Sequence, residues 1–179
     1  MQSSQDNVIL GIGTFATVTK VGNYATKQLH KGIDFRDLVA EVILIRACEH
    51  PNIIKIINVG ANYFTMPAYD CCLIEYIIKD NVAARTHRYK IAAELSSGLA
   101  YLHARGIIHG DLRGRNILVR CTNDIPTVCI CDFGISILCA ITPYTSVIQT
   151  ATHRAPEVEY STVNIAPLSI ASPQISNVS

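Results

Sequence analysis

The spacing of the apolar residues changes from strand-like to helix-like near residue 34, and this change constrains the fold more than any other feature of the sequence. Residues 8–10, 16–21 and 24–29 are short apolar or alternating runs separated by glycine-containing turns. This pattern predicts three β-strands, and the Gly22-Asn23 pair before the third is typical of a two-residue hairpin. Strands joined by such short turns form an antiparallel sheet.

A helix is predicted directly after these strands. Phe35, Leu38, Val42 and Ile45 recur every three or four residues, which places them on one face of a helix between residues 34 and 48, before Pro51 stops it. The remaining predictions are strands at 53–59, 71–78, 117–119 and 128–131, and a second helix at 85–105 that ends at Gly106.

The chain is therefore predicted to be an α+β protein in two parts. Residues 1–78 form a mostly β part with one helix, and residues 79–160 form a part led by the second helix, with the connection near residues 76–80. Residues 161–179 are rich in Ser, Pro, Ile and Asn without a clear period, which indicates a tail.

Charge and cysteine content exclude several classes of function. The 15 Lys and Arg residues balance 14 Asp and Glu residues and form no basic stripe, so we expect no nucleic acid partner. No apolar run approaches the length of a membrane span, so no membrane partner is expected. The seven cysteines contain no C-x-x-C pair, which argues against a zinc site and favours reduced thiols in the cytoplasm.

A glycine-rich turn and two charged residues suggest a phosphate site in the first part. Residues 11–18 read Gly-Ile-Gly-Thr-Phe-Ala-Thr-Val, and glycines let a backbone approach phosphate oxygens closely. Such a turn by itself is more often only a hairpin. However, Lys27 lies on the next strand and Glu41 on the following helix. A lysine facing a cleft and oriented by a carboxylate can bind phosphate.

Three further motifs follow in the second part. They are His109-Gly110-Asp111-Leu112-Arg113-Gly114-Arg115-Asn116, then Asp132-Phe133-Gly134, then Ala155-Pro156-Glu157 preceded by Thr150, His153 and Arg154. In this order and spacing, the motifs resemble those of the eukaryotic protein kinase family over residues 8–157. The resemblance implies a two-lobed fold with an antiparallel β N-lobe carrying one helix and a mainly helical C-lobe.

The resemblance also implies a role for each matching residue, with ATP and Mg²⁺ as cofactors and a protein as substrate. Lys27 would bind the α- and β-phosphates with Glu41 as its partner, Asp111 would orient the substrate hydroxyl, and Arg113 would supply a catalytic cation. Asn116 and Asp132 would bind Mg²⁺. Nucleotide contacts are expected from Leu10, Gly11, Ile12, Gly13, Thr14, Phe15, Ala16, Val18, Ala25 and Leu118, from a gatekeeper at Ile74, and from backbone groups of Glu75 and Ile77.

The sequence departs from the family pattern at several points. Ala16 replaces the third loop glycine, and Gly110 replaces an arginine that pairs with a phosphate on the activation segment, so we expect activity without such phosphorylation. Thr150 and the 153–157 segment favour Ser/Thr over Tyr specificity, whereas Arg113 is found in some tyrosine kinases.

Residues 158–179 are all that follow Glu157, whereas the family's C-lobe continues through several helices. We therefore expect an incomplete C-lobe, which implies a fragment, a natural truncation or a partner protein that completes the lobe. Two functions remain open: an active protein kinase, and a kinase-like binding module that holds nucleotide or a partner kinase with little catalysis.

Overall fold

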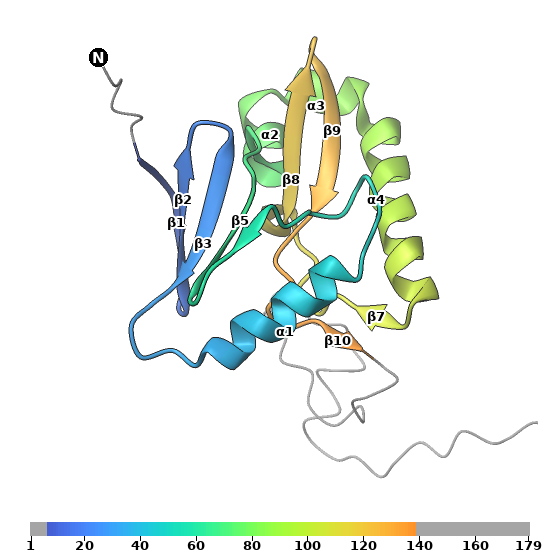
Figure 1. The fold of residues 1–179 in the computed structure, drawn as a ribbon. Coiled ribbons are helices and arrows are strands. Elements are labelled where there is room, and N and C mark those ends of the chain that lie inside the picture. The colour runs from blue at the N-terminus through green and yellow to red at the C-terminus, as the bar shows by residue number, and fades with distance from the viewer. Residues whose placement is uncertain (1–6, 139–179) are drawn as a thin grey trace, which may run out of the picture.

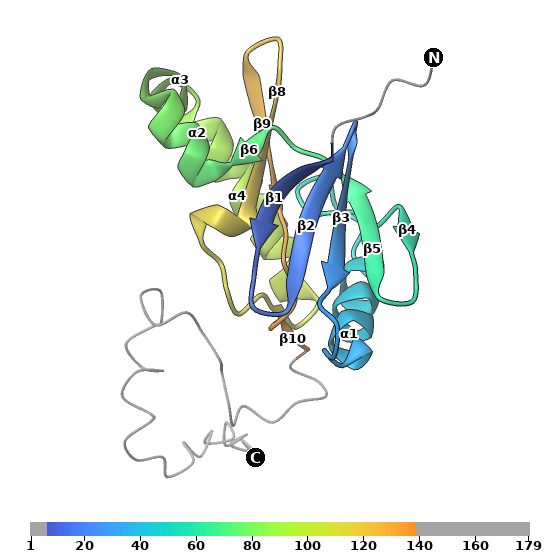
Figure 2. The ribbon, with the colours of Figure 1, turned by 90° about the vertical axis from the view of Figure 1, so that its left-hand side faces the viewer.

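The computed structural model describes residues 7–138, which form two larger β-sheets and a two-stranded one, with helices around them (Figure 1). The first sheet has five strands in the order β1-β2-β3-β5-β4, and every neighbouring pair is antiparallel. Its strands are β1 (Val8–Ile12), β2 (Ala16–Val21), β3 (Tyr24–Leu29), β4 (Asn58–Val59) and β5 (Tyr63–Pro67). Helix α1 (Phe35–Arg46) lies beside this sheet (Figure 2).

The second part combines a smaller sheet with the remaining helices. Strands β6 (Cys71–Cys72), β8 (Ile117–Thr122) and β9 (Ile125–Ile130) form an antiparallel sheet in the order β6-β8-β9. Strand β7 (Ile107–Ile108) pairs with β10 (Ile137–Leu138). The helical elements are α2 (Leu73–Lys79), α3 (Asn81–Thr86), α4 (Arg88–Ala104) and the 3₁₀ turn η1 (Gly114–Asn116).

Local sequence explains the predicted elements that the structure confirms. The Asp34 side chain accepts a hydrogen bond from the Arg36 N–H at 2.9 Å and caps α1, which satisfies one of the free donors of the first turn. Val21 pairs with Tyr24 across the two-residue turn, where Gly22 has φ +55°. A positive φ costs glycine little, so the hairpin forms there. The α+β architecture is thus as expected.

One apolar core joins the two parts. Leu38, Val42 and Ile45 of α1, together with Phe64 of β5, belong to the same buried cluster as Leu102, Ile130 and Phe133. Burying one such side chain stabilises the fold by about 1.5–3 kcal/mol. Backbone hydrogen bonds reinforce the junction: Ile54 N–H donates to the Ile130 carbonyl at 2.9 Å, and Ile130 N–H donates to the Asn52 carbonyl at 2.8 Å. The core therefore sets the position of β9 relative to α1.

Two strand predictions are wrong in part. Of residues 53–59, Asn58–Val59 forms a strand and Ile53 makes a single parallel bridge to Ile130. Of residues 71–78, Cys71–Cys72 pairs with β8, and helix α2 begins at Leu73. A short apolar run suits a strand or a buried helix equally, so its neighbours decide its conformation.

The predicted connection near residues 76–80 is displaced as well. Strand β5 belongs to the first sheet and β6 to the second, so the chain crosses between the sheets at residues 68–70, and α2 belongs to the second part. The predicted helix at 85–105 is confirmed as α4, with the short α3 before it.

Several predictions concern residues outside 7–138. These are the motif residues Thr150, His153, Arg154, Ala155, Pro156 and Glu157, and the predicted tail. Within residues 7–138, no helix combines the length and the apolar character that crossing a bilayer requires.

Candidate active site

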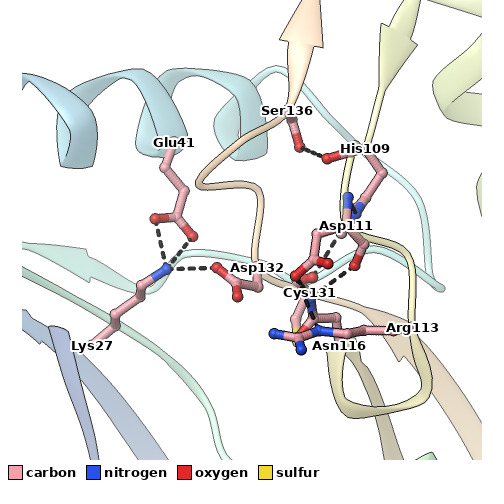
Figure 3. Close-up of polar contacts among 9 residues, drawn as sticks. All are labelled: Lys27, Glu41, His109, Asp111, Arg113, Asn116, Cys131, Asp132 and Ser136. Atoms are coloured by element: carbon pink, nitrogen blue, oxygen red, sulfur yellow. Dashed lines mark hydrogen bonds and ion pairs between the residues drawn. The ribbon is translucent and has the colours of Figure 1, made fainter. Parts of the chain in front are cut away.

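Three charged side chains from distant segments meet between the two sheets (Figure 3). Lys27 projects from β3, and its Nζ lies 2.9 Å from both carboxylate oxygens of Glu41 on α1. The same Nζ donates to Asp132 Oδ1 at 2.8 Å. Because Asp132 lies two residues after the end of β9, this contact joins the first sheet to the second. The structure thus brings together three of the predicted site residues.

The environment of these groups sets their charges. Burial disfavours the ammonium of Lys27, yet the carboxylates of Glu41 and Asp132 outweigh burial and raise its pKa. Burial also opposes ionisation of Asp132, but Lys27 prevails and lowers the pKa of that carboxyl. For Glu41, which is 4% exposed, burial prevails over Lys27 and raises the pKa. A permanent ammonium at the centre of the site is suited to binding phosphate.

A loop between β7 and β8 holds the remaining predicted catalytic groups. The Asn116 side-chain amide donates to both the backbone carbonyl and Oδ2 of Asp111, each at 2.8 Å. Arg113 forms an ion pair with Asp111, with 3.0 Å between Nε and Oδ2. These contacts fix the Asp111 carboxylate next to a cation, where it can accept a hydrogen bond from a substrate hydroxyl.

His109 and Phe133 form a buried pair beneath this loop. Their rings are 4.9 Å apart in an edge-to-face arrangement, which aromatic rings prefer. His109 Nε2 donates to the Cys131 carbonyl at 2.9 Å, and its Nδ1 accepts from the Asp111 N–H at 3.3 Å. Burial lowers the pKa of His109, so the neutral ring has both hydrogen bonds satisfied. Both residues are buried and have a packing role.

Gly110, the departure from the family pattern, has a structural cause. Its φ is +83°, and a Cβ at this position would lie 2.7 Å from the Ile135 carbonyl oxygen. Ser136 Oγ donates to the neighbouring His109 carbonyl at 2.8 Å, which keeps residues 135 and 136 against the loop. A side chain at residue 110 therefore requires the backbone to move.

Asn116 and Asp132 have the chemistry that a magnesium site needs. The Asn116 amide nitrogen is engaged by Asp111, which turns its side-chain oxygen the other way, where it makes no hydrogen bond with any residue of 7–138. One carboxylate oxygen of Asp132 accepts a hydrogen bond from Lys27, and the second oxygen remains for a metal ion. Its φ of +65° belongs to the left-handed region and aims the side chain at the site. One amide and one carboxylate oxygen suit Mg²⁺, which takes its other ligands from phosphate and water.

The predicted nucleotide-contacting residues of the first sheet lie near Lys27. In the strand register Val18 pairs with Lys27, and Ala25 is two residues before Lys27 on β3, so all three share one face. Residues 11–16 contain the turn between β1 and β2, which is closed by a hydrogen bond from Gly13 N–H to the Ala16 carbonyl at 2.9 Å. Leu10 is exposed on β1, and Leu118 lies on β8 opposite Cys72.

The predictions for Ile74, Glu75 and Ile77 need correction, because they assumed an extended chain. All three lie in α2. Ile74 packs on η1, where a Cβ on Gly114 would lie 2.6 Å from its Cγ1, and the Glu75 side chain accepts from Cys72 N–H at 3.1 Å. Ile77 is on the exposed surface of the helix.

The structure offers other residues for these roles. Met66 pairs with Ala25 and so shares the face of Lys27. In the crossing segment, Ala68 N–H donates to the Asn23 carbonyl at 2.8 Å and Arg120 donates to the Ala68 carbonyl at 2.6 Å. The Tyr69 N–H has no acceptor within residues 7–138. In the sequence, the alternating apolar residues Phe64 and Met66 were the pattern from which β5 could have been predicted.

Comparisons with known proteins show the family to which the chain belongs. A family model described as the protein kinase domain matches residues 4–166. Three similar curated proteins are calcium-dependent protein kinase 5 of Plasmodium berghei (32% identical over 86% of this chain), cyclin-dependent kinase F-4 of Oryza sativa (32% over 83%) and protein kinase gsk31 of Schizosaccharomyces pombe (32% over 85%). The matches cover 30%, 35% and 44% of these relatives, so the chain spans less than half of each.

Proposed function

Since the chain belongs to the protein kinase family, we propose that it transfers the γ-phosphoryl group of ATP to a serine or threonine hydroxyl of a protein substrate. The observation that carries this proposal is the position of Lys27 Nζ, 2.9 Å from Glu41 and 2.8 Å from Asp132. The loop of Asp111 and Asn116 lies beside it (Figure 3). Ser/Thr specificity is supported by the sequence around Thr150.

Each side chain has a role that follows from its charge and partners. Lys27 binds phosphate oxygens, and Glu41 holds its ammonium in place, because a buried carboxylate with two contacts to Nζ restricts the lysine side chain. Asp111 orients the substrate hydroxyl and takes its proton, and Arg113 stabilises negative charge beside it. Asn116 and Asp132 hold Mg²⁺, which supplies neutralisation of the phosphate charge when bound.

The nucleotide lies between the sheets in this proposal. The turn of residues 11–16 covers the phosphates with its N–H groups. The adenine ring is enclosed by apolar side chains, namely Leu10, Val18, Ala25, Met66 and Leu118. Its polar edge meets the Tyr69 N–H in place of backbone groups of Glu75 and Ile77.

The proposal includes the regulation and setting expected from the sequence. Gly110 offers no cation to a phosphorylated activation segment, so activity is expected to be the same before and after phosphatase treatment. A large loss of activity on treatment would contradict this. Cytoplasmic location and a partner protein that packs on the second part rest on the sequence alone.

A transfer assay with Mg-ATP and generic Ser, Thr and Tyr peptides tests the proposal, with Asp111→Asn as the matched control. We expect transfer to Ser or Thr peptides that falls about 10²–10⁴-fold in the variant. A thermal shift with Mg-ATP runs in parallel, since a ligand that binds the folded state raises its stability. Binding without transfer would favour the kinase-like binding module. The absence of both binding and transfer would contradict both functions.

A further inference from the structure

His30, which directly follows β3, contacts the glycine-rich turn at three points. Its backbone N–H donates to the Phe15 carbonyl at 2.9 Å. Its ring nitrogen Nδ1 lies 3.3 Å from the Thr14 carbonyl oxygen, and Nε2 lies 2.9 Å from Thr17 Oγ1. One residue therefore binds three of the four positions from 14 to 17.

The chemistry of the partners assigns the proton on the ring. A carbonyl oxygen only accepts, so Nδ1 must carry a hydrogen and donate to Thr14. Nε2 of the neutral ring then accepts from the Thr17 hydroxyl, which can donate or accept as required. All polar atoms of the imidazole are thereby satisfied, and the ring has one orientation that achieves this.

The tip of the turn depends on these bonds. Phe15 is 61% exposed, so apolar packing contributes little to holding it. At the tip, the other hydrogen bond among the described residues runs from Gly13 N–H to the Ala16 carbonyl. A Cβ built at Gly11 would meet no atom of residues 7–138 within 4 Å, so no side chain from this range packs against the start of the turn. Without the His30 ring the Thr14 peptide group could rotate, and the Phe15 carbonyl would be held only by the backbone N–H of residue 30.

The direction of the two carbonyls matters for phosphate binding. In a trans peptide unit the carbonyl and the following N–H point in opposite directions. Holding the Thr14 and Phe15 carbonyls toward His30 therefore turns the N–H groups of Phe15 and Ala16 away from it. Backbone N–H groups presented together are the donors with which such a turn binds phosphate oxygens.

We propose that His30 is a positioning residue for the nucleotide, which fixes the glycine-rich turn so that the N–H groups of Phe15 and Ala16 face the triphosphate. This inference rests on the proposed function, because it concerns the same ATP site. Preorganised donors bind more tightly than mobile ones, since less conformational entropy is lost on binding.

Two pairs of variants test it. His30→Ala removes both ring contacts, and His30→Gln restores a donor. Thr17→Val removes the hydroxyl at nearly constant shape, and Thr17→Ser retains it. We expect His30→Ala to weaken Mg-ATP binding about tenfold, the loss of one to two hydrogen bonds, and Thr17→Val about threefold. His30→Gln should recover part of the loss, and Thr17→Ser should match the wild type. At saturating ATP, kcat should change less than twofold.

Hydrogen exchange without nucleotide gives a readout that is independent of ATP. The amides of Gly13 and of residue 30, which donate to the Ala16 and Phe15 carbonyls, should exchange about tenfold faster in His30→Ala than in the wild type. Unchanged exchange rates and unchanged Mg-ATP affinity in a folded His30→Ala protein would overturn the inference. This holds even if the variant is less stable than the wild type. Should His30→Ala not fold, the Thr17→Val and Thr17→Ser pair decides by the same criteria.

The two proposals fail in different ways. A wild-type protein that binds no Mg-ATP overturns the proposed function, and the exchange rates then decide alone whether His30 holds the turn. A wild-type protein that binds Mg-ATP as tightly as His30→Ala, with equal exchange, overturns the role of His30 and leaves the proposed function intact.

Discussion

Lys27 Nζ lies 2.8 Å from Asp132 Oδ1, although 105 positions separate the two residues in the sequence. The contact joins the first sheet to the end of the second (Figure 3). Glu41 completes the group from α1, and the Lys27 side chain is 17% exposed. The site can therefore receive a ligand while its cation remains paired, and the predictions below depend on this arrangement and on the loop beside it.

Replacing Lys27 with Met is expected to lower the free energy of unfolding by about 3 kcal/mol, because it leaves the buried Glu41 carboxylate without a cation. Adding Glu41→Gln should recover part of this loss, since the amide carries no charge to bury. Urea denaturation of the two single variants and the double variant measures the coupling. Additive effects, without any coupling between the two positions, would contradict the pairing.

Stability should decrease as the pH falls below about 6.5 because of His109. Burial lowers the pKa of its ring in the folded state, whereas the unfolded chain binds a proton near pH 6.5. The unfolded state therefore holds more protons in this range, and stability decreases by up to about 1.4 kcal/mol per pH unit.

His109→Gln removes the ring that binds this proton but leaves Glu41 and Asp132 in place. The contributions of these two carboxyl groups to the pH dependence of stability therefore cancel in the comparison. The free energy of unfolding is measured for both proteins between pH 5 and 7.5. The variant should have the shallower dependence on pH. Parallel curves would show that His109 is protonated equally in the folded and unfolded states.

Gly110→Ala should destabilise the protein more than Gly32→Ala. Both glycines have positive φ, at +83° and +89°, but a Cβ at Gly32 meets no atom within 4 Å, whereas at Gly110 it lies 2.7 Å from the Ile135 carbonyl. Gly32→Ala is expected to cost about 1 kcal/mol from backbone strain, and Gly110→Ala about 2 kcal/mol more. Thermal or urea unfolding compares them, and equal losses would exclude the predicted contact.

Arg113→Ala should lower kcat about 10²-fold with less than a threefold change in the KM for ATP, because the guanidinium acts beside Asp111 and stabilises charge that develops during transfer. Arg113→Lys retains the charge without the planar group, so an intermediate loss is expected. Steady-state kinetics with a Ser or Thr peptide measure both parameters. A change confined to KM would instead assign Arg113 to ATP binding.

Local signals in the sequence were sufficient for several elements. Asp34 at the start of α1 is a side-chain cap, and the apolar stripe of Leu38, Val42 and Ile45 is the face that the core buries. The hairpin at Gly22-Asn23 follows from the conformational freedom of glycine. Such features depend on neighbours three or four residues apart, so the sequence alone predicts them.

Helix α2, which follows the crossing segment, could not be predicted in this way. Leu73–Lys79 is an apolar run that suits either a strand or a helix, and it becomes a helix because Cys71–Cys72 pairs with β8 and Ile74 packs on η1. Those partners lie about forty residues further along the chain. The assignments of Ile74, Glu75 and Ile77 failed for this reason, and Met66 and Tyr69 were missed with them.

The sequence by itself determined which chemical groups this protein carries, and in which order: a glycine-rich turn, a lysine, a glutamate and two aspartate-containing motifs. The tertiary structure alone decided that Lys27, Glu41 and Asp132 lie within hydrogen-bonding distance, and that His30 contacts the glycine-rich turn. The physical reason is that these distances are set by a shared apolar core and by strand register, both of which depend on residues far apart in the chain.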